Sequence, residues 1–322
     1  MKAPRFWQDK NRISVLAKIL APISAGYRDV VQKRLARAAQ YQSSLPVICV
    51  GNIVMGGSGK TPVVQAITCI LQQQKKKPAV LMRGYGGRIK KAQFIDQSMS
   101  AKLCGDEALL HAQYVPVMVS PDRVDGAQQI EARKDVTHIV MDDGFQNPSL
   151  HKTKSLIVLD GRNPFGNGMV FPSGPLRETL DDALGRADAL VVLGDDYDDL
   201  VTRYSAQLPV FRAQLEPVNP NDFRGKSVLA FAGIGRPEKF FATMRACGAT
   251  LVETIAFPDH HLFSEREIST ILEHAKQAGV IPVTTRKDWV RLPDGIKPLV
   301  QVLDVVLKWQ NPVEIAQFLQ KI

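Results

Sequence analysis

The sequence lacks any apolar run long enough to cross a bilayer. A transmembrane helix needs about 20 largely apolar residues. The most apolar stretch near the amino terminus, residues 11–25, is broken by Lys18 and Pro22. The same two residues interrupt the apolar centre that a secretory signal requires. We therefore expect neither a spanning helix nor a secretory signal in this segment.

Cysteines, repeats and low-complexity segments are also scarce. Four cysteines occur among 322 residues, without CxxC spacing, and no internal repeat is present. This pattern excludes a disulfide framework and a repeat architecture, and it favours reduced thiols in a cytosolic protein. With 45% hydrophobic and 23% charged residues, the composition is that of a globular protein and not of a disordered one.

Excess charge is absent from most of the chain. The formal balance is +9, and residues 1–40 account for +7 of it, because nine basic residues there stand against Asp9 and Asp29. The basic residues are Lys2, Arg5, Lys10, Arg12, Lys18, Arg28, Lys33, Arg34 and Arg37. This concentration indicates a surface for phospholipid headgroups or another polyanion, whereas nucleic-acid binders more often spread basic residues along a groove. We expect no nucleic-acid partner.

The basic amino-terminal region also has the composition of an amphipathic helix. Apolar and basic residues are interspersed through residues 11–25, and Trp7 and Tyr27 stand at the edges. Such a segment is typical of a helix that lies in the membrane interface. It is equally typical of a surface helix packed on its own domain. The residues alone leave these two alternatives open.

From residue 45 onward, short apolar runs alternate with helix-like stretches. The runs lie at residues 45–50, 79–82, 115–119, 138–141, 156–159 and 189–193. This alternation predicts an α/β fold with a parallel sheet and helices on both faces. Turn-forming residues at 216–222 predict a linker, and further apolar runs predict a second, smaller α/β domain. The predicted organisation is an amphipathic helical segment over 1–40, a first domain over 41–216 and a second over 217–322.

A glycine-rich loop follows the first strand-like run and precedes a helix-like stretch. Its residues are Gly56, Gly57, Ser58, Gly59, Lys60 and Thr61. Glycines let backbone N–H groups surround phosphate oxygens, while Lys60 would neutralise the β- and γ-phosphates and the Thr61 hydroxyl would bind magnesium. Val54 takes the place of the first glycine of the strict motif, so the loop is a variant. The order of strand, loop and helix predicts a P-loop NTPase-like sheet with a nucleotide bound at this loop.

An acidic element completes the predicted site. Residues 138–141 form an apolar run that leads directly into Asp142 and Asp143. A strand beside the first one would bring one of these carboxylates to magnesium, as the Walker B aspartate does. We therefore predict Thr61, Asp142 and Asp143 as metal ligands.

Three classes of protein share this framework. A guanine-nucleotide switch should carry Asn-Lys-x-Asp, but residues 285–288 read Thr-Arg-Lys-Asp. A partitioning ATPase should have a lysine directly before the Gly-Gly pair, where Met55 stands. A kinase needs instead a group that accepts the proton of a hydroxyl. A kinase is favoured, and a P-loop ATPase or GTPase switch acting on a membrane-associated partner stays open as the alternative.

Two polar clusters are candidates for the proton-accepting group. Residues 105–107, Gly-Asp-Glu, stand at the predicted start of a helix, where helix-end charge keeps the Asp106 carboxylate ionised. An aspartate at such a position is also a common N-cap. Residues 259–261, Asp-His-His, lie in the second domain. If the two domains close over a cleft, His260 can hydrogen-bond Asp106 and orient it.

Together these motifs resemble those of the tetraacyldisaccharide 4′-kinase family, which phosphorylates the lipid A precursor in Gram-negative bacteria. The motifs are Gly51-Asn52 with the glycine-rich loop, Arg83-Gly84-Tyr85-Gly86, Gly105-Asp106-Glu107, Asp142-Asp143-Gly144-Phe145-Gln146, Gly174-Pro175-Leu176-Arg177-Glu178, Phe257-Pro258-Asp259-His260-His261 and Thr285-Arg286-Lys287-Asp288. They lie in family order over nearly the whole chain. An ordered set of this kind is far more specific than a P-loop alone.

The resemblance implies transfer of the γ-phosphate of ATP, with Mg²⁺, to the 4′-hydroxyl of a tetraacyldisaccharide 1-phosphate in lipid A biosynthesis. It implies that Asp106 is the catalytic base and His260 its partner, with Lys60 acting in the phosphate loop. The substrate-binding residues expected on this basis are Arg83, Tyr85, Glu107, Arg123, Gln146, Asn147, Arg177 and Glu178. The enzyme is expected to be a monomer, peripheral to the cytoplasmic face of the bacterial inner membrane, on which its basic helix rests.

One position departs from the family pattern. The sequence Asp-Asp-Gly-Phe-Gln usually continues with histidine, whereas here Asn147 follows. An amide can donate a hydrogen bond, but it cannot carry a proton or a charge at neutral pH. Asn147 is therefore expected only to bind substrate.

Overall fold

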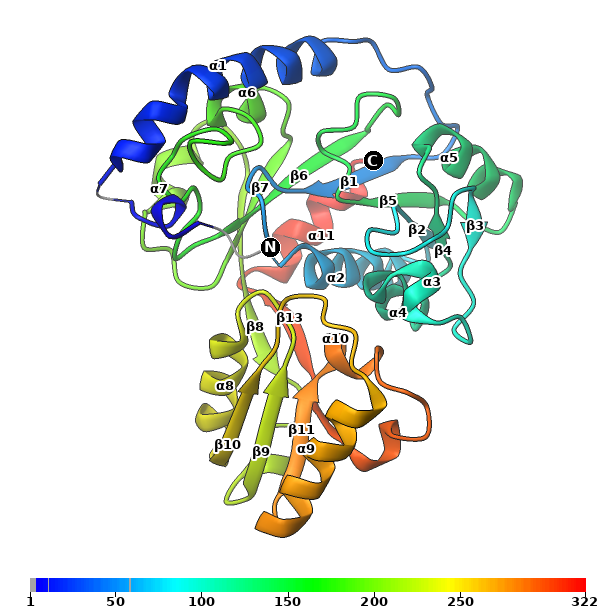
Figure 1. The fold of residues 1–322 in the computed structure, drawn as a ribbon. Coiled ribbons are helices and arrows are strands. Elements are labelled where there is room, and N and C mark those ends of the chain that lie inside the picture. The colour runs from blue at the N-terminus through cyan, green and yellow to red at the C-terminus, as the bar shows by residue number, and fades with distance from the viewer. Residues whose placement is uncertain (1–3, 11, 58) are drawn as a thin grey trace.

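The computed structural model describes residues 4–10, 12–57 and 59–322, and it contains two sheets (Figure 1). The larger has nine strands in the order β13-β8-β7-β6-β1-β5-β2-β4-β3, and the smaller has four in the order β10-β9-β11-β12. The strands are β1 Val47–Gly51, β2 Pro78–Met82, β3 Gln93–Phe94, β4 Val117–Val119, β5 His138–Asp142, β6 Lys154–Asp160, β7 Ala189–Leu193, β8 Val210–Pro217, β9 Ser227–Ala232, β10 Thr250–Ala256, β11 Ile281–Thr285, β12 Gln301–Leu303 and β13 Val305–Trp309. The predicted α/β fold is confirmed.

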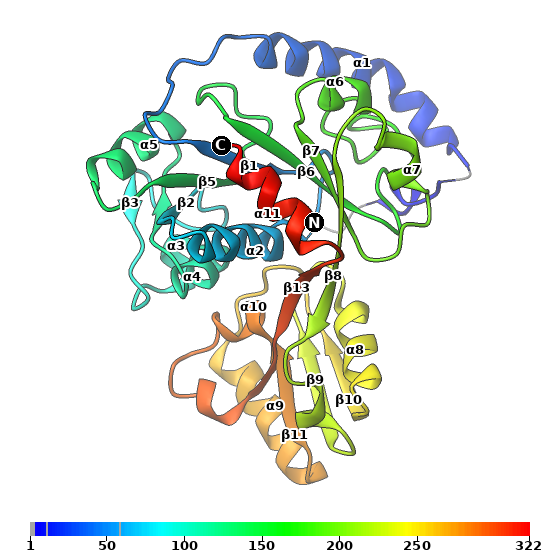
Figure 2. The ribbon, with the colours of Figure 1, turned by 180° about the vertical axis from the view of Figure 1, so that it is seen from behind.

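Helices cover both sheets. The α-helices are α1 Val15–Leu35, α2 Lys60–Gln73, α3 Ala101–Cys104, α4 Asp106–Ala112, α5 Arg123–Ala132, α6 Leu180–Leu184, α7 Leu200–Tyr204, α8 Pro237–Ala246, α9 Glu265–Ala278, α10 Arg286–Trp289 and α11 Pro312–Gln320. Short 3-10 helices lie at Arg5–Trp7, Pro220–Phe223 and Lys297–Leu299. Figure 2 shows α2 and α11 on the same side of the larger sheet, and residues of both helices enter one apolar cluster with that sheet.

The centre of the larger sheet is parallel and buried on both faces. β1 pairs in parallel with β5 on one side and with β6 on the other. Ile48 and Val50 enter the apolar cluster that includes α2 and α4, whereas Val47 and Cys49 enter the cluster that includes α5. Because helices cover both faces, the strand reads as one continuous apolar run in the sequence.

The larger sheet is mixed at its edges. β3 pairs antiparallel with β4, and β13 pairs antiparallel with β8. The seven strands from β8 to β4, with both included, pair only in parallel with one another, as predicted.

The smaller sheet belongs to a second domain with its own core. Its neighbouring strands are parallel. Phe240, Phe241 and Met244 of α8 pack in the cluster on one face, while Ile268 and Ile271 of α9 pack in the cluster on the other. This arrangement is the two-faced α/β layering that alternating strands and helices build.

The end of the chain returns to the larger sheet, which differs from the predicted second domain of residues 217–322. After β12 the chain enters β13, which pairs with β8, and α11 then buries Ile315 and Leu319 in a core cluster of the larger sheet. The backbone N–H of Val218 donates to the carbonyl of Asp304 at 2.9 Å, so the two crossings between the domains lie side by side. The second domain is thus an insertion between β8 and β13.

The amino-terminal helix is longer than the segment 11–25 that the sequence predicts, and it packs on its own domain. The Ser14 side chain accepts a hydrogen bond from the Ala17 N–H and caps the helix, while Asn11 lies outside the described residues. The Ser24 hydroxyl lies 2.9 Å from the Val170 carbonyl and 2.8 Å from the Ser173 hydroxyl. In the part of the chain that the structure describes, helices long and apolar enough to cross a membrane are absent.

The buried position of α11 makes a stability prediction. Ile315→Ala should lower the free energy of unfolding by about 2–5 kcal/mol, because the side chain is fully buried in the core of the larger sheet. Chemical denaturation would measure the change, and hydrogen exchange would show which sheet loses protection. Val313 on the same helix is 61% exposed, so Val313→Ala should change stability by less than about 0.5 kcal/mol. Loss of protection confined to β9–β12 would contradict this placement of α11.

Candidate active site

The glycine-rich loop joins β1 to α2. Gly56 and Gly59 have φ angles of 117° and 82°, which lie in the left-handed region that favours glycine. A Cβ atom on Gly59 would lie 2.5 Å from Cδ1 of Leu193, whereas one on Gly56 would meet no atom within 4 Å. Ser58 lies outside the described residues. The loop is therefore tightly packed where it enters α2 and open on the side where a phosphate chain would lie.

Val54, at the variant position of the loop, is held by backbone pairing. It forms an isolated antiparallel bridge with Leu176, and the Asn52 side chain donates to its carbonyl at 2.9 Å. This pairing fixes the backbone of Val54, at the position where the strict motif has its first glycine. The variant loop still carries Lys60 and Thr61 in the first turn of α2, where free helix N–H groups favour an anion.

Asp143 is the carboxylate that lies at the loop. Its Oδ1 is 3.6 Å from Nζ of Lys60 and 2.9 Å from a guanidinium nitrogen of Arg177. Burial raises the pKa of Asp143, but Lys60 and Arg177 outweigh this effect and bring the pKa below its ordinary value. Asp143 is therefore ionised at neutral pH, as a magnesium ligand must be.

Asp142 contacts α4. It is 3% exposed, and its Oδ2 lies 3.0 Å from Nε2 of His111, which is 1% exposed and belongs to α4. The other ring nitrogen of His111 has no hydrogen-bond partner among the described residues. His111 stands in no motif, and sequence reasoning missed it. Asp142 is thus oriented by α4, and Asp143 is the carboxylate adjacent to Lys60.

The described residues fit a magnesium ion that relies on its nucleotide for most ligands. Groups of three or more His, Cys, Asp or Glu side chains arranged as a metal cage are absent from the part of the chain described here. Magnesium in kinase and ATPase sites is commonly held by one or two carboxylates together with substrate phosphates and water. Asp143 beside Lys60 meets this requirement, with Thr61 in the adjoining helical turn.

The predicted pair of Asp106 and His260 is in contact across the two domains. Asp106 is 5% exposed, and its Oδ2 lies 3.1 Å from Nδ1 of His260, 3.7 Å from Nε of Arg291 and 4.0 Å from Nζ of Lys287. Burial raises the pKa of Asp106, but these three neighbours outweigh it and lower the pKa to about 2. The N-cap of α4 is Gly105, so the alternative interpretation of Asp106 as the cap does not hold.

Lys287 connects several predicted residues. Its ammonium group lies 3.3 Å from Oε1 of Glu107 and 3.4 Å from Nε2 of His260. Burial lowers the pKa of Lys287, but Glu107 and Asp106 outweigh burial and raise it. The ring of Tyr85 meets the ring of His260 edge-on, with centroids 6.0 Å apart. Glu107 and Tyr85 therefore border the same interdomain cluster.

Arg177 is held by a network behind the loop. Its guanidinium donates to Oε1 of Gln146 at 3.1 Å, and Gln146 donates to Glu178 at 2.9 Å. Glu178 is 1% exposed and is paired with Arg186. In this arrangement Gln146 and Glu178 position Arg177, and the exposed face of Arg177 is directed at Asp143.

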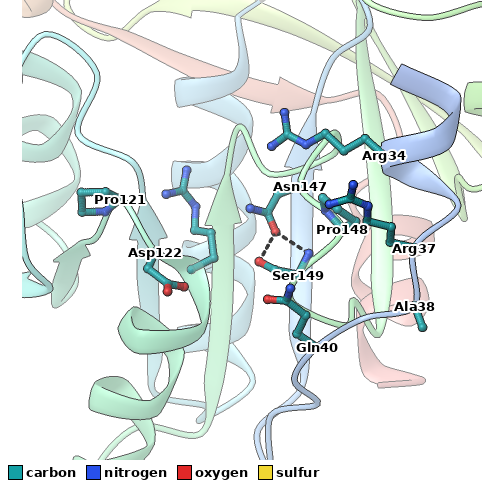
Figure 3. A pocket seen from close by; sticks show the side chains of 10 residues that line it. Arg34, Arg37, Ala38, Gln40, Pro121, Asp122, Asn147, Pro148 and Ser149 are labelled. Carbon is teal, nitrogen blue, oxygen red and sulfur yellow. Dashed lines mark hydrogen bonds between the residues drawn. The ribbon is translucent and has the colours of Figure 1, made fainter. Parts of the chain in front are cut away.

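A separate pocket of about 500 Å³ lies between the end of α1 and the segments that follow β4 and β5 (Figure 3). Its lining residues are Arg34, Arg37, Ala38, Gln40, Pro121, Asp122, Arg123, Asn147, Pro148 and Ser149. Arg123 is 4% exposed, and its Nε has no partner among the described residues. Burial, together with the neighbouring Arg83, lowers the pKa of Arg123 to about 10. Arg34 and Arg37 also line this pocket. They belong to the basic segment of residues 1–40, for which the sequence predicts only a surface for phospholipid headgroups or another polyanion.

The comparisons with known proteins agree with this geometry. The sequence profile of the family described as tetraacyldisaccharide-1-P 4′-kinase matches residues 16–322. The tetraacyldisaccharide 4′-kinase of Paramagnetospirillum magneticum is 46% identical over 317 residues, which cover 97% of this chain and 96% of that protein. The kinase of the same name from Rhodospirillum centenum is 41% identical over 317 residues, which cover 97% of this chain and 94% of that protein.

A solved structure is similar over almost the same length. It is the "apo" form of LpxK from Aquifex aeolicus in complex with ATP, which superposes with a TM-score of 0.78 at 26% sequence identity. The match covers 95% of this chain and 99% of that one. With the phosphate loop and its acidic partners in place, these matches confirm the resemblance that the motifs indicated, and this chain belongs to the tetraacyldisaccharide-1-P 4′-kinase family.

Proposed function

We propose that this kinase transfers the γ-phosphoryl group of ATP to the 4′-hydroxyl of a tetraacyldisaccharide 1-phosphate, a step of lipid A biosynthesis. The observation that carries the proposal is the buried Asp106 carboxylate, held by His260 in a chain that also presents a phosphate loop at Lys60. A nucleotide switch needs only the loop and an oriented water, whereas a kinase also needs a base for its acceptor hydroxyl. Because a single chain supplies both Asp106 and His260, one from each domain, a monomer suffices for the reaction.

Each residue has a distinct task in this reaction. Lys60 and the N–H groups of the loop hold the β- and γ-phosphates, and Arg177 stabilises negative charge beside them. Mg²⁺, when bound at Asp143, neutralises charge on the phosphate oxygens. Asp106 accepts the proton of the acceptor hydroxyl. Since its pKa of about 2 makes it a weak base, that transfer comes late, as a loose transition state allows.

His260 acts on Asp106. Its Nδ1 lies 3.1 Å from the carboxylate, and Lys287 lies 3.4 Å from its other nitrogen. This contact is made by Oδ2 of Asp106, while Oδ1 accepts a hydrogen bond from the Glu107 N–H at 2.9 Å, so the orientation of the carboxylate is fixed at both oxygens. His260 is therefore a positioning residue for the base, and its loss should disturb the base without removing it.

The pocket beside α1 is suited to the anionic headgroup of the acceptor. Arg34, Arg37 and Arg123 bring three guanidinium groups to its wall, and guanidinium binds phosphate with paired hydrogen bonds. Asn147 lies in the same wall. We assign this pocket to the phosphate and sugar portion of the lipid, with Arg83 as the exposed neighbour of Arg123.

The outer face of α1 is suited to a membrane surface. Its exposed large apolar residues are Val15, Leu16, Ile19, Ile23 and Val30. The opposite side is docked on the protein through Ser24, and the net charge of residues 1–40 is +7 from nine basic and two acidic residues. An apolar stripe on a basic helix is the arrangement of an interfacial anchor. The proposed location is the cytoplasmic face of the inner membrane, where the acyl chains of the substrate remain in the bilayer.

Phosphate transfer provides the direct test. With ATP radiolabelled at its γ-phosphate and an acylated disaccharide 1-phosphate, the wild-type enzyme should produce labelled lipid. Lys60→Ala should reduce turnover by more than about tenfold, or about 1.4 kcal/mol, because Lys60 binds charge that grows in the transition state. Lys76→Ala, at an exposed lysine beyond the end of α2, is the control and should match the wild type. Release of free phosphate without labelled lipid would instead indicate a nucleotide switch.

The base assignment predicts two different kinetic changes. Asp106→Asn should lower turnover by about 100-fold or more while the affinity for ATP stays within about twofold. His260→Ala should leave more activity but move the acidic limb of the turnover profile to higher pH. The sign follows because His260 lowers the pKa of Asp106, so that its loss raises that pKa.

Controls separate these effects from misfolding. Asp135→Asn changes an exposed carboxylate far from the cluster and should alter neither turnover nor its pH profile. An unshifted acidic limb in His260→Ala, together with turnover lowered at every pH, would limit His260 to a structural contact.

Membrane docking predicts a loss of vesicle binding. Ile19→Asp combined with Ile23→Asp should reduce sedimentation with phosphatidylglycerol vesicles by about tenfold or more, because two apolar side chains leave the interface. Turnover of a short-chain, soluble acceptor should be unchanged. Val313→Asp, which places one such charge on an exposed position of α11, is the control and should bind vesicles as the wild type does. Undiminished vesicle binding of the double variant would refute the role of this face.

A further inference from the structure

We infer that Arg236 and Lys239 of the second domain bind the phosphate chain of the nucleotide, and that Asp160 holds them beside the phosphate loop. This inference rests on the proposed function, because it needs ATP at the loop. It adds to the nucleotide site a second group of cations, supplied by the amino-terminal end of α8.

Asp160 lies next to the phosphate loop. It is the last residue of β6, the strand that pairs with β1, and its partner in β7 is Leu193. A Cβ atom on Gly59 would lie 2.5 Å from Cδ1 of Leu193, so the loop packs closely on Leu193. Asp160 is therefore paired, in the neighbouring strand, with the residue on which the loop packs. Asp143 follows β5, the strand on the other side of β1. The two strands that flank β1 are thus followed or ended by a carboxylate that pairs with cations, Asp143 with Lys60 and Asp160 with Arg236.

Two cations of α8 meet this single carboxylate. The guanidinium of Arg236, the N-cap residue of α8, contacts Oδ2 of Asp160. Nζ of Lys239, in the first turn, lies 3.0 Å from the same oxygen. The remaining oxygen of Asp160 accepts from the backbone N–H of Arg162 at 3.1 Å. These three side chains together carry a net charge of +1.

Asp160 cannot satisfy the donors directed at it. A guanidinium has five N–H donors and an ammonium has three, whereas both oxygens of Asp160 are already engaged. The side chains of Arg236 and Lys239 are 43% and 52% exposed, so they are accessible to a ligand from solvent. Burial raises the pKa of Asp160, but Arg236 and Lys239 outweigh it and lower the pKa, so the carboxylate stays ionised.

A phosphate chain supplies the acceptors that these cations lack. Guanidinium pairs with phosphate through two parallel hydrogen bonds, and ammonium binds phosphate as a point charge. The two cations are about half exposed although Asp160 is buried, so water screens their attraction to it and leaves them able to bind a further anion. Because β6, which ends at Asp160, pairs with β1, after which the loop begins, the nucleotide proposed at the loop is the polyanion that these side chains would meet. Binding through α8 would also draw the second domain toward the loop.

The experiment measures affinity without turnover. Isothermal titration would give the dissociation constants of AMP-PNP with Mg²⁺, of ADP and of adenosine, with no acceptor present. The combined variant Arg236→Gln and Lys239→Gln should weaken AMP-PNP by about tenfold, ADP by less, and adenosine by less than about twofold. Asp160→Asn should tighten AMP-PNP by about twofold to threefold, because the carboxylate no longer competes for the cations. Arg245→Gln, at an exposed arginine in the last turn of the same helix, should match the wild type.

Lys60→Ala separates failure of this inference from failure of the proposed function. If the double variant binds AMP-PNP as tightly as the wild type while Lys60→Ala weakens it, the inference is wrong and the loop assignment stands. If Lys60→Ala also changes nothing, the nucleotide site itself is misplaced. Equal weakening for adenosine and AMP-PNP would show a structural role of α8 and would overturn the inference. Should the double variant fail to fold, Lys239→Gln alone, at a half-exposed side chain, should weaken AMP-PNP by about threefold.

Discussion

The organisation of this protein depends on one contact, the hydrogen bond between the Asp106 carboxylate and His260 across two domains. A carboxylate that is 5% exposed is costly unless cations or donors surround it. Here every cation that surrounds Asp106, including Lys287 and Arg291, comes from the second domain. The proposed base is therefore surrounded by a domain that is inserted between β8 and β13 and held by two adjacent crossings. In this architecture the small second domain supplies the electrostatic environment of Asp106, and α8 of the same domain pairs Arg236 with Asp160 of the larger sheet.

The short helix α4 links the proposed base, Asp106, to the two carboxylates at the end of β5. Asp106 stands at its first position, and His111, five residues later, contacts Asp142 at the end of β5. A shift of α4 would consequently move the base and the buried carboxylate together. Asp143, which follows Asp142, instead pairs with Lys60 and Arg177. The two adjacent aspartates thus divide their tasks: Asp142 fixes the strand end against α4, and Asp143 presents its charge to the phosphate loop.

Much of this was predictable from sequence where local chemistry decides the structure. Strands buried on both faces read as apolar runs, and the glycine-rich loop follows β1 and leads into α2, whose first turn carries Lys60 and Thr61, as expected. The contact of Asp106 with His260 was expected only on condition that the domains close, because nothing local brings residues 154 positions apart together. The return of β13 was missed because that strand is half exposed and its partner β8 lies far away in sequence. His111 was missed because a single histidine inside a helix carries no pattern of its own.

The contacts of Asn147 explain what an asparagine does at the position where the family pattern has histidine. The backbone N–H of Ser149 donates to the Asn147 side chain at 3.0 Å, which requires the amide oxygen at that position. The Ser149 hydroxyl donates to the same oxygen at 2.8 Å. With its oxygen so engaged, Asn147 has only N–H donors left to offer the pocket that Arg34 and Arg123 also line. A histidine there would offer a donor whose charge depends on pH near neutrality. The amide gives the same pocket a donor that does not titrate, so the anion binding proposed for this pocket relies on guanidinium groups that stay charged at neutral pH.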